Sequence, residues 1–280
     1  MRNVCLTLAY DGTNYAGWQV QPNGTSVQEV IEGAIHDLTG EKVRIMVAGR
    51  TDAGVHAIGQ VANFPTTSTI SCEGIRAALQ VRLPEDIIVR EAVDVPEDFH
   101  ATRSAKKKRY RYVIHTGRAK YPFLRQYAYH WRGRLDAGAM HEAAQVLVGT
   151  HDFRSFESHF PNKSSSVRTI FETSVTRHAG WPTWDRGVDK KQHALEDDAQ
   201  QRPFLWFDVV ADGFLYNMVR AIIGTLIRVG ELKWNGADLK QILESQSRAH
   251  AGTTAPAHGL YLVEVDYGDE FGIGAGGPTA

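Results

Sequence analysis

A chain of 280 residues, 42% hydrophobic and 22% charged, has the composition of a globular protein and is long enough for one large α/β domain or two packed halves. No apolar run approaches the roughly 20 residues of a membrane span, and residues 1–12 lack the apolar stretch and cleavage site of a signal peptide, so we expect a soluble cytoplasmic protein with no membrane partner. The only two cysteines, Cys5 and Cys72, form no CxxC motif, which argues against a disulfide framework and a zinc knuckle.

The first part of the chain shows the pattern of strands and helices in a βαββαβ order. Residues 4–10 alternate apolar and polar side chains, as in a strand with one buried face. Ser26 and Glu29 have the spacing of a capping box, and apolar positions then recur at helical spacing until Gly40. The pattern further predicts strands over 43–48, 58–64 and 87–95 and a helix over 72–83. This order is that of a ferredoxin-like unit.

A similar but less regular order follows in the second part. We predict strands over 110–115, 167–177, 204–210 and 260–266 and helices over 137–148, 214–229 and 237–244. The expected fold is α+β, with two ferredoxin-like halves at 1–103 and 104–267, a mixed and mainly antiparallel sheet, and a cleft between the halves. Residues 180–202 read as an insertion loop and residues 268–280 as a disordered, Gly-rich tail.

A basic segment at residues 99–135 contrasts with the formal net charge of -1. It holds eleven Lys or Arg residues, no Asp or Glu, and several interleaved Tyr and Trp rings. Such a local excess attracts phosphates, and the rings can stack on bases. A solvated charged face is the alternative, but the pattern favours an RNA-binding surface.

The residues that could carry chemistry gather in the nine-residue segment 48–56, which joins two predicted strands. It contains Gly49, Arg50, Asp52, Gly54 and His56. Glycines permit a close backbone approach, so this loop could present Asp52 to a ligand. From the residues alone, a tight turn closed by an Asx-type hydrogen bond is the more ordinary interpretation.

Residues 49–56, Gly-Arg-Thr-Asp-Ala-Gly-Val-His, resemble the signature loop of the tRNA pseudouridine synthase A (TruA) family. Further segments resemble motifs of the same family, in family order, at residues 10–19, 99–101 with 109–112, 213–220 with 224–226, and 255–262. The resemblance implies the pseudouridine synthase fold, and it implies the isomerisation of uridine to pseudouridine in the anticodon stem-loop of tRNAs by a homodimer. That reaction needs no cofactor, and the histidines show no spacing typical of a metal site, so we expect neither a cofactor nor a metal.

The resemblance also assigns roles to residues. It implies that Asp52 is the nucleophile, that Arg220 pairs with it, and that Tyr110 packs on the target base. Helical spacing agrees for Arg220, since it falls off the predicted buried stripe. On a strand Tyr110 and Tyr112 face the same way, and we expect Tyr110 in the site and Tyr112 in the core.

Two further residues of the loop have less definite roles. Arg50 is suited to bind a phosphate or to fill the gap left by a flipped base, with a structural ion pair as the alternative. His56 we expect to order the backbone by hydrogen bonding, not to act as a base.

Two other functions remain open from the sequence. One is a non-catalytic tRNA-binding or tRNA-folding protein, which the basic segment would explain equally well. The other is a metal-dependent phosphodiesterase, although such enzymes gather several carboxylates around the ion and Asp52 has no acidic neighbour between Glu41 and Glu73.

Overall fold

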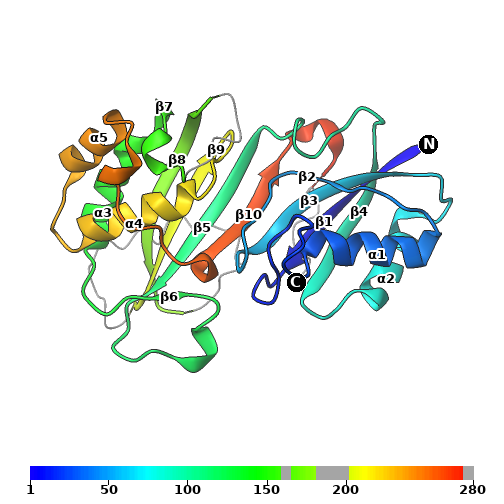
Figure 1. Ribbon diagram of the computed structural model, residues 1–280, viewed down its shortest axis with the longest axis horizontal. Helices are drawn as coiled ribbons and strands as arrows, with labels where there is room; N and C mark the ends of the chain where they lie inside the picture. Colours follow the sequence, from blue (N-terminus) through cyan, green and yellow to red (C-terminus); the bar gives the residue numbers. More distant parts are fainter. Residues whose placement is uncertain (159–164, 181–201, 274–280) are drawn as a thin grey trace. The chain divides into compact units, whose positions relative to one another are not determined.

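The computed structural model describes residues 1–158, 165–180 and 202–273 (Figure 1). Over these residues it contains ten strands, most of them paired antiparallel, and five α-helices. The chain is therefore an α+β protein, as predicted. It divides into two units, Met1–Lys108 with Tyr261–Ala280, and Arg109–Leu260. Every helix in the described ranges is too short or too polar to cross a membrane.

The first unit has the predicted βαββαβ order. In its sheet β1 lies between β4 and β3, antiparallel to both, so that Val4 pairs with Asp94 on one side and with Phe64 on the other. On the far side of β3, β10 pairs parallel and β2 antiparallel. Its elements in chain order are β1 (Arg2–Tyr10), α1 (Val27–Thr39), β2 (Met46–Val47), β3 (His56–Thr66), α2 (Cys72–Arg82), β4 (Ile87–Val95) and β10 (Leu260–Asp266).

The helices of this unit begin and end where the sequence indicates. The Ser26 hydroxyl accepts the Glu29 N–H at the start of α1, and Gly40 ends the helix with a φ of 75°. In Figure 1 helix α1 lies in front of the strands, and α2 contacts both α1 and β4. The two helices bury one apolar face of the sheet, which is the main source of stability for amphipathic helices.

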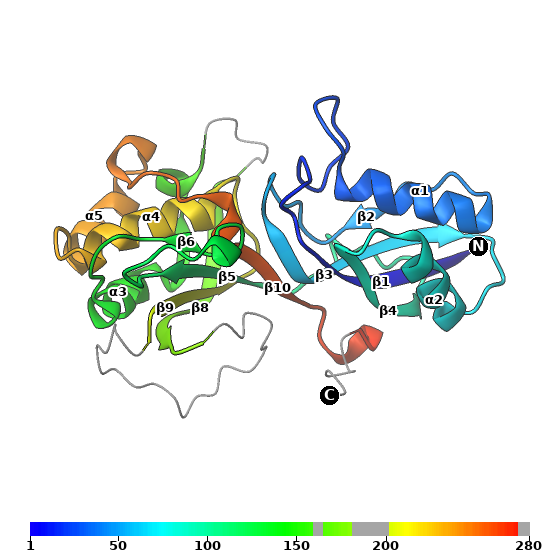
Figure 2. The same ribbon diagram turned by 90° about the horizontal axis from the view of Figure 1, so that it is seen from below.

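The second unit orders its strands β5–β9–β8–β7, with β6 added to β5 in a parallel pairing. The helices α3, α4 and α5 contact one another, and Figures 1 and 2 show them gathered together. Its elements are β5 (Lys107–His115), β6 (Tyr129–His130), α3 (Ala137–Ala144), β7 (Gly149–Asp152), β8 (Val167–His178), β9 (Phe204–Ala211), α4 (Met218–Gly230) and α5 (Gly236–Glu244).

Helix α4 is buried along nearly its whole length. The six residues of the predicted apolar stripe are all in the core, namely Leu215, Met218, Val219, Ile222, Leu226 and Val229. Gly224 allows a close approach of the main chain, since a Cβ placed on it would lie 1.8 Å from the Thr253 carbonyl oxygen. The helix therefore packs directly against the main chain of the segment that leads to β10.

Some elements differ from prediction. The strand expected over 43–48 is reduced to Met46–Val47. Helix α4 begins at Met218 instead of residue 214, because Asn217 adopts a left-handed φ of 60°, which a right-handed helix cannot continue through. The sequence pattern does not predict the short strands β6 and β7.

The structure also differs from the prediction in the place of the last strand and in the first residues of the C-terminal tail. The last strand, β10, belongs mainly to the first unit, whereas the sequence pattern places it in the second half. Residues 268–273, expected to be disordered, include a 3₁₀ turn at Asp269–Phe271, and the Phe271 ring packs 5.0 Å from the Phe99 ring. The predicted insertion loop, except for its first and last residues, and the rest of the tail lie outside the described residues.

Candidate active site

Asp52 lies at the start of a tight turn between β2 and β3 of the first unit. The Val55 N–H donates to the Asp52 carbonyl oxygen over 3.1 Å, and Gly54 adopts a φ of 76°. That backbone conformation favours glycine. Main-chain atoms close this turn. The Asp52 side chain is half-buried and that of Arg50 is exposed.

The segment from Tyr10 to Gln19 packs on the Asp52 loop. This close packing explains why the segment contains Gly12 and Gly17. The Trp18 N–H donates to the Thr51 carbonyl oxygen over 2.9 Å. A Cβ on Gly12 would lie 2.0 Å from the Val55 carbonyl oxygen, and one on Gly17, whose φ is 95°, would lie 2.7 Å from that of Thr51. Only glycine allows the two main chains to approach this closely on either side of Asp52.

A buried hydrogen-bond network lies beneath the loop. The Tyr10 hydroxyl is 2.8 Å from the Thr51 hydroxyl, and the Gln60 amide donates to the Gly49 carbonyl oxygen over 2.7 Å and to the Tyr10 hydroxyl over 3.3 Å. Burial raises the pKa of Tyr10 to about 12, so its hydroxyl keeps its proton at neutral pH. The network fixes the Gly49 carbonyl and the Thr51 side chain, both shortly before Asp52. Sequence reasoning missed it, although a glutamine inside an apolar strand was a signal.

Lys108 supports the beginning of the same loop. Its ammonium group donates to the Ala48 carbonyl oxygen over 2.6 Å, and the Thr102 hydroxyl donates to the Val47 carbonyl oxygen over 2.5 Å. In the sequence, Lys108 is one of several cations of the basic segment and nothing connects it with the loop. Its hydrogen bond gives it a structural role close to Asp52.

His56 orders the backbone at the end of the loop, as predicted. The Gly12 N–H donates to its Nδ1 over 3.1 Å. The ring is 2% exposed and stacks on Tyr261 at 4.8 Å. The imidazole therefore joins three segments of the first unit, namely the turn after β1, the Asp52 loop and β10.

Tyr110 and Tyr112 occupy alternate positions on β5 in the second unit. The Tyr112 ring is fully buried and its hydroxyl donates to the Pro256 carbonyl oxygen over 2.8 Å, which confirms its prediction as core. Burial raises the pKa of Tyr112 well above its usual value. The Tyr110 ring is 7% exposed and meets the Phe214 ring edge-on at 4.9 Å.

Arg220 projects from the first turns of α4 and lies off the buried stripe, as the helical spacing predicted. Its Nε donates to the Ala255 carbonyl oxygen over 2.7 Å, and its Nη1 donates to the Asn217 side-chain oxygen over 2.7 Å. The Ala255 N–H in turn donates to the Arg220 carbonyl oxygen. The guanidinium is therefore held in one orientation by α4 and by the segment before β10. Of the four predicted site residues, Asp52 and Arg50 lie on one loop of the first unit. Tyr110 and Arg220 both belong to the second unit.

The basic segment does not form one solvent-facing surface, contrary to the prediction. Arg111 is completely buried, with its Nε 3.1 Å from Asp208 and its guanidinium 4.0 Å from the centre of the Trp206 ring. Arg109 pairs with Glu172 at 3.5 Å. These acids stand on β9 and β8, so strands distant in sequence supply the carboxylates that the segment itself lacks. Burial raises the pKa of Asp208, while Arg111 opposes that shift.

The cations that face solvent come mostly from the loop between β5 and α3. Exposed side chains there, just before β5 and at its first residue are Arg103, Lys106, Lys107, Arg118, Lys120, Arg125, Arg132 and Arg134. Lys106 lies 3.6 Å from Glu270. The surface suited to phosphates is therefore centred on residues 118–134, a narrower region than the sequence indicated.

Comparison with known proteins places this arrangement in a family. A family model described as tRNA pseudouridine synthase matches residues 7–102 and 143–268. The tRNA pseudouridine synthase A of Acetivibrio thermocellus is 47% identical over 267 residues, which cover 95% of this chain and 100% of that protein. The protein of the same name from Moorella thermoacetica is 46% identical over 94% of this chain and 98% of its own length.

Proposed function

Since the chain belongs to the tRNA pseudouridine synthase family and is an isomerase of that kind, we propose that it converts uridine to pseudouridine in the anticodon stem-loop of tRNAs, with Asp52 as the nucleophile. The observation that carries this proposal is the Asp52 loop. It has the family's signature sequence, and its turn is closed by main-chain atoms. Gln60 and Lys108 hydrogen-bond to its backbone, and Tyr10 to its Thr51 side chain.

The reaction breaks the C–N glycosidic bond, turns the uracil and forms a C–C bond from its C5 to the same sugar carbon. The proton on C5 is lost and N1 gains one, so the change needs no net oxidation or reduction. A carboxylate suits such a sequence because it can form a temporary covalent adduct and then leave. We assign this role to Asp52, and we write the reaction without metal or cofactor.

The nucleophile has to be ionised while sheltered from water, and burial alone would disfavour its charge. We therefore assign Arg220 to pair with Asp52 across a cleft between two ferredoxin-like halves. Its support is the fixed guanidinium on α4, held by Asn217 and Ala255. We assign Tyr110 to pack on the target base and the exposed Arg50 to a phosphate or to the gap left by the flipped base.

The proposal also covers the oligomeric state and the cellular location of the enzyme. We propose a homodimer located in the cytoplasm, where tRNA is available as substrate. Sedimentation of the purified chain at micromolar concentration tests the dimer, and a single species of monomer mass would remove this part of the proposal.

Release of tritium from tRNA labelled at C5 of uridine tests the activity directly. Wild-type protein should release tritium in the presence of excess chelator, and Asp52→Asn should release none while binding tRNA with unchanged affinity. An active Asp52→Asn variant would refute the nucleophile. Binding without release by the wild type would favour the alternative of a non-catalytic tRNA-binding protein.

Mapping the product tests the position within the tRNA. Pseudouridine can be labelled chemically so that it stops reverse transcription at the modified residue. Stops confined to the anticodon stem-loop would support the proposed substrate region, and stops confined to another arm would refute it.

A further inference from the structure

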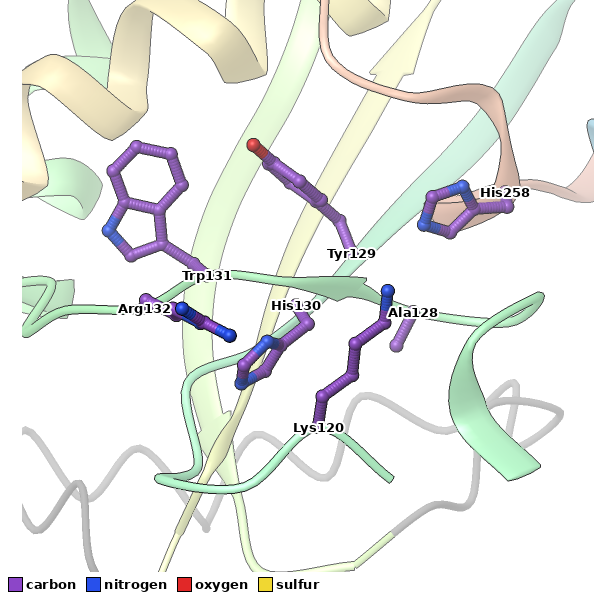
Figure 3. Close-up of a pocket in the computed structure, with 7 residues that line it drawn as sticks. All are labelled: Lys120, Ala128, Tyr129, His130, Trp131, Arg132 and His258. Carbon is purple, nitrogen blue, oxygen red and sulfur yellow. The ribbon is translucent and has the colours of Figure 1, made fainter. Parts of the chain in front are cut away.

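A pocket of about 420 Å³ lies in the second unit beside β6 (Figure 3). Small-molecule sites occupy about 300–1,000 Å³, so this pocket has room for one ring system with its substituents. None of its lining residues is acidic; they are Lys120, Ala128, Tyr129, His130, Trp131, Arg132 and His258. None of these residues has a role in the proposed chemistry.

The backbone that carries the pocket is fixed by β5. Tyr129 and His130 pair with Ile114 and His115, and the Trp131 N–H donates to the His115 carbonyl oxygen over 3.0 Å. Side chains alternate along this short strand. Figure 3 shows the Tyr129 and Trp131 rings on one side of it and His130, with Lys120, on the other. The pocket therefore has an aromatic side and a cationic side.

The aromatic side is built from rings that contact one another. The Tyr129 ring lies 6.0 Å from the Trp131 ring and 6.3 Å from the His258 ring, both at steep angles. Trp131 and Tyr129 are half-buried, so each ring is packed in place and still partly accessible. A planar base can gain stacking energy on such rings whatever its sequence.

The cationic side combines two exposed charges with an ordered turn. Lys120 and Arg132 are both exposed. His130 Nε2 donates to the Gly117 carbonyl oxygen over 2.9 Å, which ties β6 to the turn that precedes Lys120. Lys120 and Arg132 both line the pocket, and an arginine fork matches phosphate oxygens.

A nucleotide has the two properties that this pocket recognises, a flat base and an anionic phosphate separated by a ribose. We propose that the pocket binds one unpaired nucleotide of the RNA substrate, with its base against Tyr129 and Trp131 and its phosphate between Lys120 and Arg132. The inference rests on the proposed function, because that function supplies a structured RNA with looped-out bases. The pocket acts as an anchor separate from the residues that do the chemistry.

Two variants test the two sides of the pocket in the full-length protein, with a tRNA transcript as the probe. Lys120→Gln with Arg132→Gln should weaken tRNA binding about tenfold and lower the slope of log Kd against log salt by about 0.7 for each phosphate that the variant no longer neutralises. Trp131→Leu should weaken binding about fivefold or more with an unchanged slope, because stacking releases no counterions. Trp131→Phe should restore most of the affinity.

The matched control removes two exposed cations elsewhere, by Arg82→Gln on α2 with Lys240→Gln on α5. It should change the tRNA Kd less than the pocket double variant does, and kcat at saturating tRNA should stay at the wild-type value in this control variant. Circular dichroism and a thermal melt confirm that each variant is folded.

Equal Kd values for the pocket and control variants would overturn the proposal. A wild-type tRNA Kd combined with abolished binding of free uridine monophosphate would assign the pocket to a free nucleotide and would also overturn it. Failure of the proposed function is separate, since it appears as absence of tritium release by the wild type. Weaker tRNA binding by the pocket variants would support the pocket in either case.

Discussion

Replacing Gly12 by alanine should inactivate the enzyme without unfolding it. The new methyl carbon would lie 2.0 Å from the Val55 carbonyl oxygen, whereas ordinary contact begins at 3.4 Å. The main chain at Val55 would have to retreat by about 1.4 Å, the difference between these two distances. This shift also breaks the hydrogen bond from the Gly12 N–H to His56. A displacement of about 1 Å at a reacting group lowers the rate by about 100-fold.

The assay compares Gly12→Ala with Gly33→Ala, which makes the same chemical change on the exposed face of α1, where a Cβ would meet nothing within 4 Å. We expect kcat/KM for tritium release to fall about 100-fold or more in Gly12→Ala and the free energy of unfolding to fall by about 1–3 kcal/mol, as for other overpacked sites. Gly33→Ala should keep full activity and gain up to about 1 kcal/mol of stability, because glycine disfavours a helix interior.

The reasoning is refuted if Gly12→Ala is folded and its kcat/KM lies within about threefold of the wild type. It is also refuted if Gly33→Ala loses activity to the same extent, since the loss would then come from any added methyl group and not from the clash with the Asp52 loop. Binding of tRNA should change little in either variant, because neither glycine lies in the basic region at residues 118–134.

Three other predictions follow from the contacts of the two units. Lys108→Met removes the charged donor to Ala48, and we expect kcat to fall about tenfold with a nearly unchanged tRNA Kd, as measured by single-turnover kinetics and filter binding. Arg111→Met leaves Asp208 buried without its partner and should lower the free energy of unfolding in urea by about 3–5 kcal/mol; a cost below about 1 kcal/mol would contradict the buried pair. Tyr10→Phe should cost about 1–2 kcal/mol at neutral pH. Because burial raises the pKa of Tyr10 to about 12, above that of an unfolded tyrosine near 10, its contribution is complete below about pH 10 and disappears as the pH rises to about 12, so the wild-type advantage should shrink over that range.

Most helices and strands could be predicted because their signals are local. The cap at Ser26 and the left-handed Gly40 set the ends of α1, and the apolar stripe of α4 is a property of neighbouring turns. The start of α4 could not be predicted, since it depends on one residue, Asn217, in a left-handed conformation. The two-residue strand β6 gives no period to detect and exists only because β5 pairs with it.

The sequence motif of the candidate site could be predicted, but the side chains that support it in the fold could not. The signature loop identified Asp52, but the side chains that hold the loop come from β1, β3 and the basic segment, at Tyr10, Gln60 and Lys108. The prediction that the basic segment forms an RNA-binding surface was wrong at Arg111 for the same reason. Its sequence neighbours are basic, whereas its partner Asp208 stands 97 positions away on β9.

The parallel pairing of β10 with β3 has a consequence for the order of events during synthesis. His56, at the end of the Asp52 loop, stacks on Tyr261, which the ribosome adds more than 200 residues later. At about 5–20 residues per second, residues 109–260 take roughly 8 to 30 s to make. During that interval the nascent first unit lacks the strand β10 and the Tyr261 ring that packs on His56, so the Asp52 loop gains its complete surroundings only after β10 has been made.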